Sequence, residues 1–197
     1  MKPLIIIQAR LGSTRLPGKV LMEIRHLPML AYLYMRLEDY DWALTTPDDQ
    51  LFESAWSDAF LWEGNEDDVA GRFADVLGVR KPDTFIRLCG DSPLMDPTLI
   101  NAAIALYEPP YLEIRSPVGC VEVCDTAAFL ADLPGMSAHE REHVTLRLRP
   151  AGKIITVGSG PRLVVDTQAD FDRVRGVIEK MTRPHTEYGW RECVSLL

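Results

Sequence analysis

The stretch LIIIQARLGSTRLPGKVL, residues 4–21, joins an apolar run to a loop rich in positive charge. Residues 4–7 include three consecutive isoleucines, which predicts a buried strand of a parallel sheet. Three cations, Arg10, Arg15 and Lys19, follow within ten residues. In an α/β chain, the loop after the first strand is a common place for an anion to bind.

The loop has the composition of a phosphate-binding loop but not the spacing of a familiar one. Gly12 and Gly18 allow the backbone to approach a ligand closely, and Pro17 excludes a helix through the loop. Exposed backbone N–H groups beside cations suit a polyanion, most simply a phosphate chain. Five residues separate the two glycines and Val20 follows Lys19, so neither a P-loop nor G-x-G-x-x-G is present. A solvated basic loop is the alternative.

Composition restricts the class of protein. The 197 residues predict a single domain, 1–197, and an apolar content of 47% supports a full core. A net charge of −8 argues against a general nucleic-acid surface or an anionic membrane as a partner, and makes a concentrated cationic loop more informative. The chain carries no apolar run of membrane-spanning length and no signal-peptide layout, so we expect a cytoplasmic protein.

The four cysteines form no C-x-x-C pair, so we expect mostly buried free thiols, and a Cys/His zinc site is the open alternative. Strand and helix signals alternate along the chain, which predicts a mostly parallel sheet with helices on both faces. Strands are expected at 4–7, 42–46, 60–64, 83–91, 153–158 and 162–166, with an antiparallel insertion at 120–124. Helices are expected at 29–40, 47–59, 65–79, 98–108, 125–133, 137–149 and 167–181.

Two aspartates stand at the ends of predicted strands. Asp91 ends the strand TFIRLCGD, and Asp166 ends RLVVD just before Thr167, the expected N-cap of a helix. Both should lie at the sheet edge that carries the basic loop, where two carboxylates could hold Mg²⁺ against a phosphate chain. The alternatives are a turn-forming role for Asp91 and a helix-capping role for Asp166.

The segment HEREH, residues 139–143, matches the zinc-protease pattern H-E-x-x-H. In that interpretation His139 and His143 would bind zinc and Glu140 would be the general base. The two middle positions are both charged, which does not suit the buried helix of such proteases. A solvated charged helix and a place in a substrate pocket are the other interpretations.

Five motifs together resemble the cytidylyltransferase family that includes the CMP-KDO and CMP-sialic-acid synthetases, and within it the spore-coat polysaccharide biosynthesis protein F type. They occur in the family's order: IIIQARLGSTRLPGKVL, EGNEDDVAGRF, IRLCGDSPLMDP, EREHVT and VVDTQADFDRV. The resemblance implies a three-layer α/β/α sandwich of the nucleotide-diphospho-sugar transferase type. It also implies transfer of CMP from CTP to a sugar, an acidic one by analogy with those synthetases, with release of pyrophosphate, for surface polysaccharide biosynthesis.

The resemblance also implies roles for individual residues. The nucleotide would contact Ala9, Arg10, Gly12, Ser13, Arg15, Lys19, Gly64, Asn65 and Asp67. Arg10 and Lys19 would be catalytic, stabilising charge on the α-phosphate and on pyrophosphate. Mg²⁺ would be held by Asp91 and Asp166, and the acceptor sugar would lie toward Glu122, Arg141, Glu142 and His143.

The chain departs from the family at residues 109–124, where the segment is shorter than expected and SPVGCVEVC lacks the acidic residues before Val-Glu-Val. This region helps to shape the sugar pocket and the dimer contact in relatives, so the acceptor and a homodimer are left open. A metal-dependent glycosyltransferase of the same fold and a non-catalytic nucleotide-binding homologue are the rival hypotheses. The glycosyltransferase usually needs D-x-D at the end of a middle strand, whereas DYD at 39–41 precedes a strand here.

Overall fold

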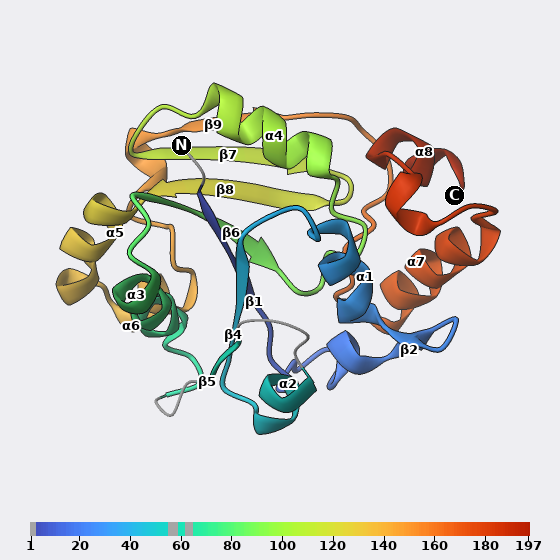
Figure 1. The fold of residues 1–197 in the computed structure, drawn as a ribbon, viewed down its shortest axis with the longest axis horizontal. Coiled ribbons are helices and arrows are strands. Elements are labelled where there is room, and N and C mark those ends of the chain that lie inside the picture. The colour runs from blue at the N-terminus through green and yellow to red at the C-terminus, as the bar shows by residue number, and fades with distance from the viewer. Residues whose placement is uncertain (1–2, 55–58, 62–64) are drawn as a thin grey trace.

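A twisted sheet forms the centre of the molecule (Figure 1). The structure is a computed structural model that describes residues 3–54, 59–61 and 65–197. Within these residues the sheet has seven strands in the order β5-β4-β1-β6-β8-β7-β9. The strands are β1 (Leu4–Gln8), β4 (Trp42–Thr46), β5 (Ala59–Leu61), β6 (Thr84–Cys89), β7 (Tyr111–Ser116), β8 (Gly119–Asp125) and β9 (Lys153–Thr156). Strand β8 runs antiparallel to β6 and β7, and the other pairs are parallel.

Helices cover both faces of this sheet. One layer contains α1 (Met29–Arg36), α2 (Asp49–Ser54), α4 (Pro97–Leu106), α7 (Gln168–Lys180) and α8 (Trp190–Ser195). The other contains α3 (Val69–Arg80), α5 (Thr126–Asp132) and α6 (Ala138–Glu142). A two-stranded sheet of β2 (Glu23–Ile24) and β3 (Leu27–Pro28) precedes α1. The expected α/β/α sandwich with an antiparallel insertion is therefore confirmed.

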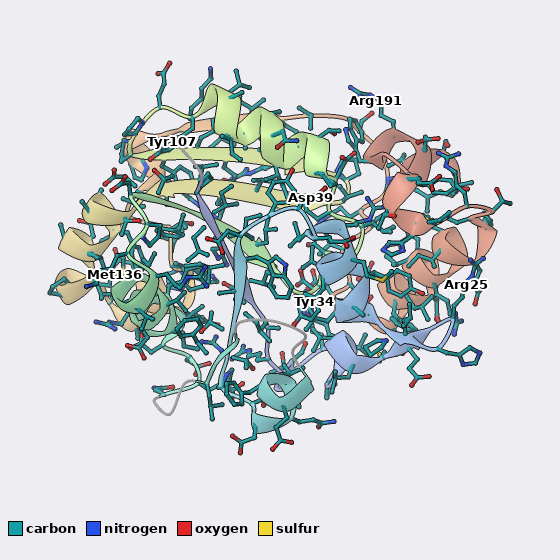
Figure 2. All side chains as sticks on the ribbon, viewed as in Figure 1. Arg25, Tyr34, Asp39, Tyr107, Met136 and Arg191 are labelled. Atoms are coloured by element: carbon teal, nitrogen blue, oxygen red, sulfur yellow. The ribbon has the colours of Figure 1, made fainter. Side chains whose placement is uncertain are left out.

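Strand β1 explains why both faces need helices. Its side chains alternate between two apolar clusters, with Ile5 and Ile7 in one and Leu4 and Ile6 in the other. A strand buried on both faces reads as a continuous apolar run, as predicted. Figure 2 shows the side chains that fill the two spaces between sheet and helices, with Tyr34 on the α1 side and Met136 on the α3 side.

Two expected elements were wrong. Residues 162–166 form no strand, because their N–H groups bridge two different loops: Leu163 N–H donates to Pro117 and Val165 N–H donates to Asp91. The expected helix at 137–149 ends at Glu142, because Val144 adopts a left-handed φ of 49° that no helix continues. Part of the expected segments 47–59 and 60–64 lies outside the described residues.

The parallel pairing of β1 with β6 creates the place for a site. Both strands end at the same edge, where Gly90 N–H donates to the carbonyl of Gln8 at 2.9 Å. A Cβ on Gly90 would lie 3.0 Å from the Cβ of Ala9, so the close approach of the two strand ends favours glycine. Among the helices described, none combines the length and the apolar character that a membrane span requires.

Candidate active site

A pocket of about 420 Å³ opens at the carboxyl ends of β1 and β6. Five of its lining side chains are Lys or Arg and three are Asp or Glu, although the whole chain has a net charge of −8. The pocket therefore suits a polyanion of nucleotide size. It is lined by Gln8, Ala9, Arg10, Ser13, Thr14, Arg15, Lys19, Val20, Val69, Arg72, Arg87, Cys89, Gly90, Asp91, Glu142, His143 and Asp166.

The loop after β1 turns back on itself before Lys19. The N–H groups of Ser13 and Gly18 both donate to the carbonyl of Leu11, at 2.8 and 2.9 Å. Gly18 has a φ of 68°, a left-handed conformation that glycine adopts without steric cost. A short 3₁₀ helix (Lys19–Leu21) starts directly after it and directs Lys19 into the pocket.

The Lys19 ammonium lies between the two predicted metal ligands. Its Nζ donates to Asp91 Oδ2 at 3.1 Å and to Asp166 Oδ1 at 3.5 Å. The carbonyl of Val165 accepts a third bond at 2.6 Å. Two aspartates far apart in sequence thus share one cation, so the predicted convergence of Asp91, Asp166 and Lys19 is present in the structure.

Asp166 is held in place from both sides. Arg15 Nη2 donates to Asp166 Oδ1 at 2.8 Å. The backbone N–H groups of Asp166 and Thr167 both donate to Asp170 Oδ2, at 3.3 and 2.9 Å. The capping box of α7 therefore also fixes the residue that precedes the helix. This donor set of two carboxylates and a backbone carbonyl fits a hard cation such as Mg²⁺, since it offers oxygen ligands alone.

The second motif meets the basic loop through Arg10. Arg10 Nη1 donates to Asp67 Oδ1 at 3.0 Å and to Glu66 Oε1 at 3.3 Å. Asn65 Oδ1 accepts from the N–H of Asp67. The predicted nucleotide contacts Gly12, Asn65 and Asp67 are not among the residues that line the pocket, and Gly64 lies outside the described residues.

The four residues predicted to face the acceptor divide into two pairs. Glu142 and His143 line the pocket. Arg141 instead donates to Asp68 Oδ2 at 2.7 Å and to the carbonyl of Leu133, away from the lining. Glu122 is buried behind the pocket wall, on β8.

Glu122 does not line the pocket itself but pairs with Arg87, which does. Arg87 donates from Nη1 to Glu122 Oε2 at 2.5 Å and from Nε to Gln8 Oε1 at 2.8 Å. Arg149 Nη2 also donates to Glu122 Oε1 at 2.7 Å, and the hydroxyl groups of Tyr111 and Thr145 donate to the same oxygen at 3.1 and 3.3 Å. Burial on its own would raise the pKa of Glu122, but Arg87 and Arg149 outweigh it and hold the pKa below its usual value. Glu122 therefore stays ionised and neutralises the buried Arg87.

The HEREH segment does not reproduce the zinc-protease arrangement. Glu140, the would-be general base, completes the capping box of α6 with Ser137 and also accepts from Arg147 Nε at 3.0 Å. Ligand atoms of His139, Glu142 and His143 do lie within 4.8 Å of one another, but all three are exposed.

Sequence reasoning missed Gln8, Thr14, Arg72 and Arg87 among the polar residues of the pocket. Gln8 and Arg87 occupy strands that otherwise read as apolar, and Arg72 lies within the apolar stripe of α3, three residues after Val69. The signal that could have found these three residues is a polar side chain in an otherwise buried pattern, which needs a partner or a ligand.

Comparison with known proteins gives a consistent result. The family model described as cytidylyltransferase matches residues 4–119. The spore coat polysaccharide biosynthesis protein SpsF of Bacillus subtilis is 34% identical over 90% of this chain and 86% of its own. A 3-deoxy-manno-octulosonate cytidylyltransferase of Solibacter usitatus is 35% identical, over 56% of this chain and 48% of that protein.

Solved structures share the fold. A cytidylyltransferase from Leptospira borgpetersenii superposes with a TM-score of 0.88 at 22% identity, covering 100% of this chain and 94% of that one. A CMP:2-keto-3-deoxy-manno-octonic acid synthetase solved with CTP gives a TM-score of 0.72 at 21% identity, covering 91% and 99%. The match of the family model to more than half of the residues, together with the relative aligned over most of both chains, shows that this chain belongs to the cytidylyltransferase family.

Proposed function

We propose that this chain transfers CMP from CTP to a hydroxyl group of an acidic sugar, in a Mg²⁺-dependent reaction that releases pyrophosphate. The single observation that carries the proposal is the convergence of Lys19 with Asp91 and Asp166 in a cationic pocket. Family membership supports the choice of CTP, and the names of the octulosonate-specific relatives support an acidic sugar. By analogy with SpsF, the product would serve the synthesis of a surface polysaccharide.

The reaction is an in-line displacement at the α-phosphorus. A hydroxyl oxygen of the sugar forms a bond to this phosphorus, its proton passes to water, and the bond to the bridging oxygen breaks, so that pyrophosphate leaves. Positioning and neutralisation of charge supply most of the rate in such reactions. Asp91 and Asp166 would hold Mg²⁺, which neutralises charge on the triphosphate when bound.

The side chains of the pocket bind the triphosphate and the acceptor. Arg10 and Lys19 stabilise negative charge on the α-phosphate and on the leaving pyrophosphate. Arg15, which is largely exposed at the mouth of the pocket, attracts and holds the triphosphate. His143 and Glu142 lie on the α6 side and contact the acceptor.

The test is release of pyrophosphate from CTP on addition of a panel of acidic sugars, with neutral sugars as the control. We expect release with CTP, Mg²⁺ and at least one acidic sugar, and none after removal of the metal with a chelator. Release of a nucleoside diphosphate from a nucleotide sugar would instead identify a glycosyltransferase. Binding of CTP without turnover in any mixture would identify a non-catalytic homologue.

A further inference from the structure

Arg72 is a buried cation on the wall of the pocket. It is 2% exposed, although α3 brings it to the pocket lining beside Val69. Among the described residues, neither its Nε nor its Nη1 has a hydrogen-bond partner. An arginine buried with unpaired donors is costly, since the charge has lost water without gaining an acceptor.

Two of the carboxylates near Arg72, those of Asp68 and Glu66, accept hydrogen bonds from other donors. Asp68 Oδ1 caps α3 by accepting from the N–H of Gly71, and Asp68 Oδ2 accepts from Arg141. Glu66 accepts from Arg10. Burial lowers the pKa of Arg72 to about 10, with repulsion from Arg10 adding to the effect, so the side chain remains charged at neutral pH.

Two other arginines with little exposed surface find acceptors for most of their donors, and of their buried nitrogens only Arg36 Nε has no partner among the described residues. Arg36 donates from Nη1 and Nη2 to the carbonyls of His185 and Tyr188. Arg87 donates to Glu122 and Gln8. Arg72 differs from both, because it lines the pocket while its buried Nε and Nη1 both lack an acceptor among the described residues.

We infer that Arg72 is the receptor for an anionic group of the bound substrate, either a phosphate of the nucleotide or the carboxylate of an acidic acceptor. Both groups present oxygens that a guanidinium binds with two parallel hydrogen bonds. The protein thus keeps a buried donor unsatisfied until the substrate arrives. The choice of a nucleotide phosphate or an acceptor carboxylate as the ligand rests on the proposed function. The free-energy cost of burying the unpaired charge of Arg72 does not.

The test compares Arg72→Met with Arg36→Met. Methionine replaces each guanidinium by an apolar group of similar reach. We expect Arg72→Met without ligand to melt at or above the wild-type temperature, because an unpaired buried charge is removed. Arg36→Met should melt well below it, because carbonyls lose their donors. If Arg72→Met melts as low as Arg36→Met, Arg72 is a structural residue and the inference is wrong.

Ligand affinity is then measured by calorimetry for wild type and Arg72→Met. The probes are CTP with Mg²⁺, inorganic pyrophosphate, and 3-deoxy-manno-octulosonate added to the CTP-bound protein. If Arg72→Met binds CTP with an affinity at least about tenfold lower, Arg72 contacts the nucleotide. If its affinity for CTP is unchanged and its affinity for the sugar acid falls by the same factor, Arg72 contacts the acceptor carboxylate. Unchanged affinity for all three probes would overturn the inference.

Two further cases need to be distinguished: an Arg72→Met protein that does not fold, and a wild-type protein that binds neither ligand. If Arg72→Met cannot be purified folded, Arg72→Gln removes the charge while keeping a polar side chain, and the same affinity criteria apply. If wild-type protein binds neither CTP nor the sugar acid, the proposed function fails. The melting temperatures and the pyrophosphate affinity then still decide the role of Arg72.

Discussion

Lys19 is paired with Asp91 and Asp166 in the structure, and the proposed reaction would require it to contact the nucleotide as well. Without ligand its ammonium lies between Asp91 and Asp166, where it prevents two carboxylates from facing each other unneutralised. In the proposed reaction, the same side chain would contact phosphate oxygens of CTP. A lysine suits this exchange, because its charge sits on a flexible stem with rotatable donors.

We expect Lys19→Ala to reduce turnover by roughly a hundredfold or more, the effect typical of losing one charge-stabilising donor. The measurement is kcat from pyrophosphate release, with melting temperature recorded in parallel. Lys153→Ala is the control, since this exposed lysine on β9 lies outside the pocket lining. Turnover near the wild-type value in a folded Lys19→Ala protein would remove Lys19 from the mechanism.

At the scale of elements, Asp170, which completes the capping box of α7, also fixes the backbone of Asp166 in the pocket. Burial on its own would raise the pKa of Asp170, but hydrogen bonds from Thr167 and Arg173 outweigh it and lower the pKa to about 2. A carboxyl group with a lowered pKa in the folded state stabilises the protein above its unfolded pKa. That stabilisation is lost as pH falls from about 4 toward 2.

Asp170→Asn should therefore lower stability at pH 7 by about 0.5–1 kcal/mol, because the helix N-terminus loses its negative charge. The difference from wild type should narrow on acidification to pH 3. Urea denaturation at both pH values measures it. The control is Asp172→Asn on the same helix, which removes an exposed ion pair with Arg175. If Asp170→Asn lowers the free energy of unfolding by the same amount at pH 7 and pH 3, the pKa of Asp170 is not lowered in the folded state.

At the scale of the whole molecule, the pocket concentrates positive charge within an acidic protein. Lys19 and Arg15 pair with Asp91 and Asp166, but five lining cations against three lining carboxylates leave the pocket with an excess of positive charge. Binding a metal-complexed triphosphate there should stabilise the folded state, since the unfolded chain has no such site.

We expect CTP with Mg²⁺, at about 100 times its dissociation constant, to raise the melting temperature by roughly 5–10 °C for a domain of this size. CTP with a chelator should give a smaller shift if Asp91 and Asp166 bind the metal, because without Mg²⁺ these carboxylates repel the triphosphate. ATP with Mg²⁺ serves as the specificity control. Equal shifts with and without Mg²⁺ would argue against a metal site at these aspartates.

Several features of the fold and site could be predicted from short windows of sequence. The apolar run of β1 predicted a buried strand, and Thr167 as the expected N-cap predicted the start of α7. Asp91 and Asp166 were found from their positions after predicted strands. The error at 162–166 shows the limit: an apolar run indicates burial, but whether it pairs as a strand depends on which neighbours offer acceptors.

The amino-acid sequence by itself determined the layer architecture, the cationic loop and the capping of α7, because periodicity and capping act over a few neighbouring residues. Only the tertiary structure decided that Lys19 lies between two aspartates 72 and 147 residues away. It also decided that Glu122 stands behind Arg87, and that Arg72 lines the pocket while its Nε and Nη1 have no hydrogen-bond partner among the described residues. These relations depend on strand order and helix packing, which bring together side chains that no local pattern links.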